Sequence, residues 1–134
     1  MCRLPYIYAI NTTSQTLADN SNIAFNAVPV HRTNCIGFMG TSFVIKKSGS
    51  YEISFDANVD ATVTGAVTLQ ILANGIPIAT GLVNGIAGTA KHFHLQSVVN
   101  VRPSCKCIDN TTNIQVLLVD GATITNPSIL IKAI

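Results

Sequence analysis

The sequence predicts an all-β fold, an antiparallel β-sandwich of the jelly-roll kind, on three observations. Apolar and polar residues alternate strictly over residues 51–60, which is the two-residue period of a strand with one buried face. Glycine, proline, asparagine and aspartate recur at short intervals between such stretches, as turns require. No stretch carries apolar residues at helical spacing over three turns. Half-buried strands joined by frequent turns bury their apolar faces when two sheets pack together.

The most regular pattern lies in the first half of the chain. Residues 43–45 form a short apolar alternation, and residues 51–59 form a longer one. The connection 46–50 includes Gly49, which tolerates the backbone angles of a tight turn. We expect the two strands to pair as an antiparallel hairpin, with Phe55 in the core.

The N-terminal part is predicted to hold short strands separated by polar loops. The first strand covers residues 6–10, and the Ser-, Thr- and Asn-rich residues 11–22 form a loop with at most a short edge strand. A short strand follows at 23–25. A loop through Pro29 then leads to the apolar residues 35–38, where glycine marks a bulge or a close approach.

The C-terminal half begins with a clear hairpin signal. Residues 67–73 alternate as a strand, and Asn-Gly at 74–75 is the sequence that two-residue hairpin turns favour. The return strand covers 76–80, and the glycine-rich residues 81–88 read as a loop. A long strand is predicted over 91–101.

Two apolar strands near the C-terminus are candidate subunit contacts. Residues 114–119 are apolar on both faces, which marks an interior strand or a contact between chains. After a turn at Asn-Pro 126–127, residues 129–134 form the last strand. The candidate contact residues of these two strands are Ile114, Val116, Leu117, Val119, Leu130 and Ile134.

Composition limits the classes of partner. The 134 residues fit a short arm, 1–5, and one jelly-roll domain, 6–134. Hydrophobic residues make up 48% of the chain and charged residues only 10%, against roughly 25% charged in average domains. That balance indicates a homo-oligomer. The net charge of +2 comes from scattered cations, so we expect no nucleic-acid partner. We also expect no secretory signal and no membrane insertion, since no run approaches the roughly 20 apolar residues that span a bilayer.

Four cysteines permit two disulfides: Cys2, Cys35, Cys105 and Cys107. A chain without a signal is ordinarily made in a reducing compartment, so these residues are either thiols inside a cell or bonds formed after release. Cys105 and Cys107 lie two apart, which on an extended segment is at the edge of bridging distance. Each of them is expected to pair elsewhere or to stay free, and all four are candidates for bonds within or between subunits.

Two histidines are weak metal candidates. His92 and His94 share one strand face, and Cys105 and Cys107 repeat their spacing, so a zinc site of two His and two Cys is conceivable. On an exposed strand such a pair is more often solvated, and we expect no metal and no other cofactor. The six carboxylates offer no paired acid and base, and the GxSxG, HExxH and phosphate-loop motifs are missing, so we expect no enzyme.

Four motifs span most of the chain from about residue 6 onward. They are IAFN at 23–26, SFVIKKSGSYEISFDANV at 42–59, ILANGIPI at 71–78 and PSILIKAI at 127–134. Their order resembles the jelly-roll heads of the tumour necrosis factor and complement-type superfamily, most of all the C-terminal domains of bacterial collagen-like exosporium proteins. The resemblance implies a compact homotrimer, with the sheet that bears the last strand near the three-fold axis.

The sequence departs from that family in two places. No Gly-X-Y stalk precedes the head, so a collagen-tethered role is not carried over. The segments CKC and DNTTN replace the Gly-Asp step that is common before the penultimate strand, so the family's loop contacts are not carried over either.

The leading hypothesis is a non-enzymatic structural protein, a self-assembling trimeric subunit of a bacterial spore-surface layer, the exosporium, or of a fibre-like appendage. A head without a stalk needs another tether, so residues 1–5 either connect subunits, with Cys2 bonded to a neighbour's cysteine and by preference in the CKC segment, or form a frayed end. One alternative is a phage protein on the virion exterior, a capsid decoration or fibre head. Another is a receptor- or sugar-binding head.

Overall fold

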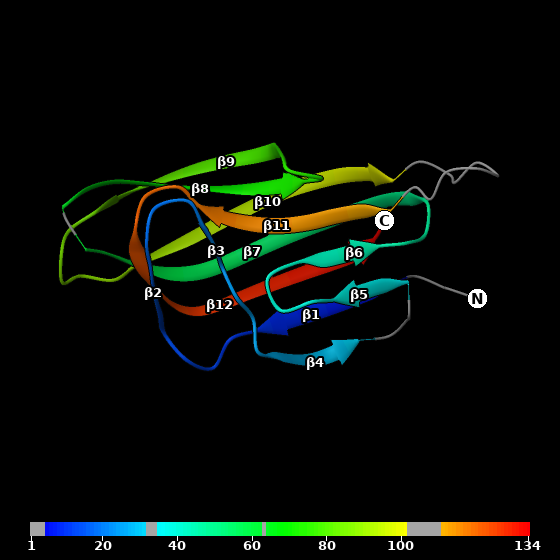
Figure 1. Ribbon diagram of the computed structural model, residues 1–134, viewed down its shortest axis with the longest axis horizontal. Coiled ribbons are helices and arrows are strands. Elements are labelled where there is room, and N and C mark those ends of the chain that lie inside the picture. The colour runs from blue at the N-terminus through cyan, green and yellow to red at the C-terminus, as the bar shows by residue number, and fades with distance from the viewer. Residues whose placement is uncertain (1–4, 32–34, 63, 102–110) are drawn as a thin grey trace.

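A computed structural model describes residues 5–31, 35–62, 64–101 and 111–134, and these residues form two antiparallel sheets packed face to face (Figure 1). Sheet A has the order β10-β7-β12-β1-β4, with β2 paired to β12. Its strands are β10 (Lys91–Val101), β7 (Gly49–Ala61), β12 (Ala122–Ala133), β1 (Tyr6–Ile10), β4 (Ala27–His31) and β2 (Gln15–Leu17). The all-β jelly-roll sandwich predicted from the sequence is confirmed.

Sheet B has the order β5-β6-β11-β8-β9, with β3 paired to β11. Its strands are β5 (Ile36–Phe38), β6 (Phe43–Ile45), β11 (Thr112–Leu118), β8 (Gly65–Ala73), β9 (Ile76–Gly85) and β3 (Ser21–Asn22). The hairpin predicted at Asn74-Gly75 joins β8 to β9, and both turn residues have positive φ, 52° and 81°. The predicted strand at 91–101 is confirmed as β10 with the same bounds.

The predicted hairpin between residues 43–45 and 51–59 is wrong. β6 pairs with β5 and β11 in sheet B, whereas β7 pairs with β10 and β12 in sheet A. The connection between them crosses from one sheet to the other, and the hydroxyl of Tyr51 donates a 2.8 Å hydrogen bond to the carbonyl of Lys47 there. Alternation predicts which face of a strand is buried, but it does not predict which strand pairs with it. The two strands lie in different sheets, and the apolar faces of both point into the same core.

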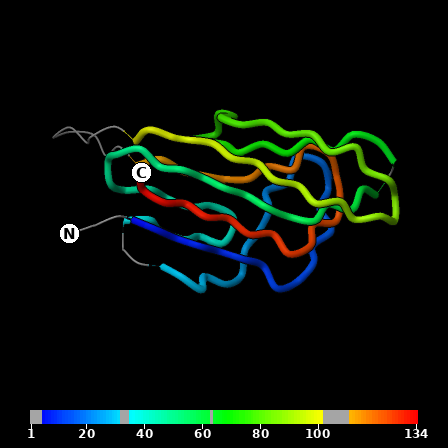
Figure 2. The backbone as a smooth tube through the Cα atoms, turned by 180° about the vertical axis from the view of Figure 1, so that it is seen from behind, coloured from blue at the N-terminus to red at the C-terminus, as the bar shows by residue number. Residues whose placement is uncertain are grey.

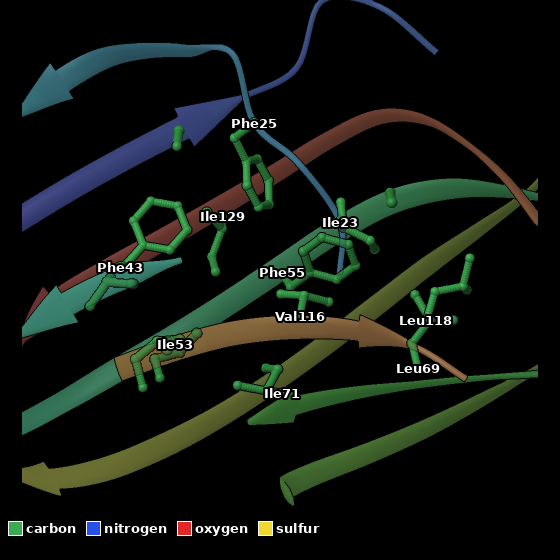
Figure 3. Packing of buried hydrophobic residues seen from close by; sticks show 14 of the residues in the cluster. Ile23, Phe25, Phe43, Ile53, Phe55, Leu69, Ile71, Val116, Leu118 and Ile129 are labelled. Atoms are coloured by element: carbon green, nitrogen blue, oxygen red, sulfur yellow. The ribbon is translucent and has the colours of Figure 1, made fainter. Parts of the chain in front are cut away.

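The core lies between the sheets and is centred on aromatic rings (Figure 3). Phe55 of β7 is fully buried, and its ring centroid lies 6.4 Å from that of Phe25 and 6.3 Å from that of Phe93. Phe43 of β6 adds a ring from sheet B, 5.5 Å from Phe25. The strict burial alternation along β7 confirms the predicted register, with Phe55 inside.

The glycine-rich stretch predicted as a loop is largely strand, because β9 continues to Gly85. Gly81 packs so closely on Phe93 of sheet A that a Cβ at position 81 would lie 2.6 Å from the ring. A Cβ at Gly85 would likewise overlap the Cβ of Ala61 on β7. These glycines permit a close approach of the two sheets.

Two further predictions failed where proline interrupts the pattern. The expected loop around Pro29 is β4, an edge strand in which a missing amide donor is tolerated. The expected turn at Asn126-Pro127 lies inside β12 as a bulge, where the register to β7 shifts between Thr125 and Ser128.

The expected short strand at 23–25 is an irregular segment of the sandwich. Ile23 and Phe25 are buried, and their amides donate to the carbonyls of Val116 and Gly40. The apolar residues there are buried, as the sequence predicted, but residues 23–25 do not form a regular hydrogen-bonded strand.

The start of β1 and the end of β12 lie at the same end of the sandwich, as Figure 2 shows. Tyr6 is paired with Lys132, and the amide of Ala133 donates a 2.9 Å hydrogen bond to the carbonyl of Pro5. The first and last described strands are therefore neighbours in the middle of sheet A.

Candidate functional site

The outer face of sheet A carries apolar side chains along β1 and at one position of β12. Ile7 and Ala9 point into the core, so Tyr6, Tyr8 and Ile10 point outward, and each remains only half-buried. Leu130 of β12 lies directly opposite Tyr8 in the register. We call Tyr6, Tyr8, Ile10 and Leu130 the apolar patch.

A small hollow borders this patch beside the bulge of β12. It has a volume of about 230 Å³ and is lined by Tyr8, Ile10, Asn126 and Pro127 among others. Asn11 also lines it, is 7% exposed and donates a side-chain hydrogen bond to the carbonyl of Ala24. Asn126 lies in the bulge and has a positive φ of 51°, a conformation that asparagine tolerates.

The same face is polar over β7 and β10. Glu52 accepts a 2.9 Å hydrogen bond from the side-chain amide of Gln96 across the two strands. Further along, Asp56 lies directly opposite His94, and its Oδ1 is 2.9 Å from Nδ1 of that histidine. The outer face of sheet A thus changes from polar over β10 and β7 to apolar along β1, and on β12 only Leu130 joins the apolar residues, between the polar Ser128 and Lys132.

The six predicted contact residues do not share one surface. Ile114 and Val116 are 0% and 1% exposed in the core of their own chain, so they offer nothing to a neighbour, and their prediction as contact residues is corrected. Both side chains point into the core because they occupy alternate positions along β11, where buried and half-buried residues alternate. Leu117 and Val119 are half-buried on the sheet B side.

The remaining two candidates belong to sheet A. Leu130 lies in the apolar patch, and Ile134, 72% exposed, follows the end of β12. Tyr6, Tyr8 and Ile10 were missed, although the signal was present. Residues 6–10 are apolar on both faces, the same feature that singled out residues 114–119.

The two histidines predicted as weak metal candidates share one carboxylate. Nε2 of His92 lies 3.3 Å from the Oδ1 of Asp56 that also meets His94. The cysteines paired with them in the zinc hypothesis, Cys105 and Cys107, lie outside the described residues. As the side chains lie, no group of three or more His, Cys, Asp and Glu residues in the described part of the chain is arranged to hold a metal ion.

Cys35 is a disulfide cysteine. It is 8% exposed, immediately precedes β5 and is disulfide-bonded. The other three cysteines, Cys2, Cys105 and Cys107, lie outside the described residues, as does most of the predicted arm, 1–5. The predicted connection of subunits through Cys2 stays a prediction.

Tyr51 is the one buried tyrosine among the described residues. Its side chain is 1% exposed, and this burial raises the pKa of its hydroxyl above the ordinary value because the phenolate would lose its hydration. The neutral hydroxyl donates to the Lys47 carbonyl and so closes the crossing between β6 and β7.

A membrane-spanning helix is not found among the described residues, where no helix is long and apolar enough to cross a bilayer. No protein-family model matches the chain, and no curated protein matches its sequence.

Solved structures resemble the chain in fold over nearly its whole length. A crystal structure of murine APRIL at pH 5.0 aligns with a TM-score of 0.74 at 9% identity, over 97% of this chain and 99% of that one. A second, at pH 8.0, gives a TM-score of 0.73 at 8% identity with the same coverage. The globular domain of zebrafish complement 1qA gives 0.62 at 9% identity, over 97% and 95% of the two chains. The chain therefore has the jelly-roll fold of tumour necrosis factor and complement-type heads.

Proposed function

We propose that this chain is a non-enzymatic structural protein whose homotrimers form part of a bacterial spore-surface layer or appendage. The observation that carries the proposal is the apolar patch on the outer face of sheet A. It lies on the sheet that bears the last strand, the position that the family resemblance places near a three-fold axis.

Burial of this patch between chains would account for the unusual composition. Tyr6, Tyr8 and Ile10 follow one another on the outer face of β1, Leu130 lies opposite Tyr8 on the paired strand, and only 10% of the chain is charged. Aromatic and aliphatic side chains of this kind are enriched at the centres of protein interfaces, where charged residues are depleted. A closed trimer removes this surface from water.

A role outside the reducing cytosol is supported by Cys35. Disulfides persist in extracellular and surface proteins and are rare in cytosolic ones. A disulfide-bonded Cys35 suits an assembly that functions after release from the cell. The spore surface itself rests on the resemblance of the motifs at 23–26, 42–59, 71–78 and 127–134 to exosporium heads.

Native mass spectrometry and light scattering test the trimer directly. Leu130→Asp should convert the trimer to monomers, because a charge buried at the contact without a partner costs several kcal/mol. Leu117→Asp is the matched control, since Leu117 is also half-buried but lies in sheet B. A wild-type monomer at micromolar concentration would refute the trimer, and dissociation by Leu117→Asp alone would move the contact to sheet B.

The location is tested separately. Antibodies against the chain, viewed by immunogold electron microscopy on the producing cells and their spores, should label the spore exterior. Label on phage particles would instead assign the chain to a virion.

A further inference from the structure

The charged side chains of the described residues are divided between the two ends of the sandwich. Strand β7 runs from one end to the other (Figure 1), and its 13 residues span roughly 40 Å at about 3.3 Å per residue. We call the end at Gly49 the basic end and the end at Ala61 the acidic end. Their separation exceeds the Debye length of about 8 Å at physiological salt, so the two ends do not neutralise each other within one chain.

The acidic end carries three of the five carboxylate side chains in the described ranges: Asp19, Asp60 and Asp120. Asp60 is paired with Thr123 where β7 ends and β12 begins, and the amide of Gly121 donates a 2.6 Å hydrogen bond to Oδ1 of Asp19. The one described lysine at this end, Lys91, donates to a backbone carbonyl and not to these carboxylates. Negative charge therefore predominates at this end.

A hollow of about 260 Å³ at the acidic end is lined by Asp19 and Asp120 and also by Thr62 and Thr64. Oδ2 of Asp120 accepts a 3.0 Å hydrogen bond from the amide of Thr68. Each of the two carboxylates thus uses one oxygen for a backbone amide. Among the residues that the structure describes, the other oxygen of each has no hydrogen-bond partner and no cation within ion-pair distance. These oxygens can accept charge-assisted hydrogen bonds from an ammonium group.

The basic end carries three of the four described lysines: Lys46, Lys47 and Lys132. Lys46 and Lys47 are exposed in the crossing between β6 and β7. Lys132 lies opposite Glu52, which is hydrogen-bonded to Gln96. In the described part of the chain, no carboxylate side chain lies within ion-pair distance of Lys46. The ammonium group of Lys46 is therefore accessible to a partner.

The contact proposed for the trimer leaves both ends uncovered. The apolar patch lies on the outer face of sheet A, whereas the charged groups lie where the long strands of that sheet begin and end. An acidic end and a basic end on one chain are complementary between two copies that point in the same direction. A head-to-tail contact that does not close into a ring generates an open filament.

We propose that trimers stack head to tail along the long axis of the sandwich, with Lys46 of one copy in the hollow between Asp19 and Asp120 of the next. This inference rests on the proposed trimer, because one exposed ion pair contributes little by itself. A trimer whose three chains point the same way makes three such contacts at once, and linked contacts reinforce one another. Stacking of this kind builds an appendage from a single protein.

Sedimentation velocity and negative-stain electron microscopy of the purified wild-type chain test the stacking. We expect species larger than the trimer at low salt, and their dissociation to trimers at about 1 M salt, where the Debye length falls to about 3 Å. Asp19→Asn combined with Asp120→Asn should abolish the larger species and leave the trimer intact, because each amide keeps an oxygen for its backbone bond. Asp56→Asn is the matched control, since Asp56 lies midway along β7 and stacking should be unchanged.

Exchange of charge between the two ends identifies the contact. Lys46→Glu places a carboxylate against the hollow, and Asp120→Lys places an ammonium group against Lys46, so neither variant should stack alone. An equimolar mixture should stack again, because each variant then meets an oppositely charged partner at both of its ends. Circular dichroism shows whether the variants fold. If Asp120→Lys does not fold, Asp19→Lys takes its place.

The outcomes separate this inference from the proposed trimer. Wild-type trimers that stay separate at low salt overturn the stacking and leave the trimer standing. Binding of polyglutamate by such trimers would give the basic end an anionic polymer as its partner. Larger species that persist at high salt and in the Asp19 and Asp120 double variant would place the contact elsewhere and also overturn the proposal. A wild-type monomer refutes the trimer, and salt-sensitive chains of monomers would retain the contact between ends.

Discussion

Gly81 of β9 lies against the ring of Phe93 of β10, so that a methyl group at position 81 would stand 2.6 Å from the ring carbon Cζ. The two residues belong to different sheets, so this contact is a close approach of β9 to β10 across the sandwich. We predict that Gly81→Ala destabilises the fold by about 1 to 3 kcal/mol, as overpacking does. Chemical denaturation measures the loss.

Two variants isolate the cause of that loss. Thr80→Ala, at the exposed neighbouring position, should change the free energy of unfolding by about 0.5 kcal/mol or less. Phe93→Leu should make Gly81→Ala less costly, because residues in contact are not additive. Independent, additive effects at positions 81 and 93 would contradict the close contact.

Phe55 should be among the most costly core positions. Its ring is fully buried between Phe25 and Phe93, so Phe55→Ala should lower the free energy of unfolding by about 3 to 5 kcal/mol. Ser54, the next residue, points outward, and Ser54→Ala should cost about 0.5 kcal/mol or less. Similar losses from both changes would show that the register of β7 is wrong.

Stability should fall at alkaline pH through Tyr51. Burial raises the pKa of this hydroxyl in the folded state, so the folded chain holds the proton more strongly than the unfolded chain does. The stabilisation is fully present below the ordinary tyrosine pKa of about 10 and is lost as the pH rises through the folded value. Tyr51→Phe should flatten this decline above pH 10 and should cost about 1 kcal/mol at neutral pH through the lost hydrogen bond to Lys47. Thermal melts of both chains from pH 7 to 11 give the comparison, and parallel declines would exclude Tyr51 as the cause.

The sequence predicted the strands better than their arrangement. Alternation from Tyr51 onward identified β7 and its buried face, and Asn74-Gly75 identified the β8–β9 hairpin. The pairing of β6 with β11 joins residues about 70 positions apart, as Phe43 and Ile114 show, and no local pattern carries such a contact. Gly81 was interpreted as part of a loop for a related reason. The residue that requires a glycine there, Phe93, lies on another strand and is not visible in the local sequence.

The candidate sites show the same limit. His92 and His94 were visible as a spaced pair, but Asp56 becomes their partner only through the register of β7 against β10. Leu130 was chosen from an apolar strand, and it acquires its surface only when Tyr8 lies opposite. Ile114 and Val116 were chosen on the same signal, yet packing against the other sheet buries them. The sequence alone does not distinguish an apolar strand in a core from one at an interface.

The last prediction concerns the disulfide of Cys35. This residue immediately precedes β5, an edge strand of sheet B, and the described strands on either side of residues 32–34 belong to different sheets. A disulfide limits the freedom of the unfolded chain, so its reduction should lower the free energy of unfolding by about 2 to 4 kcal/mol. We expect a reducing agent to lower the melting temperature of the wild-type chain. The melting temperature of Cys35→Ser should not show this decrease, because the variant lacks the bond. Mass spectrometry after alkylation without reduction should find Cys35 unmodified in the wild type. A fully alkylated Cys35, or a melting temperature that is independent of reductant, would refute the bond and remove its support for a function outside the cytosol.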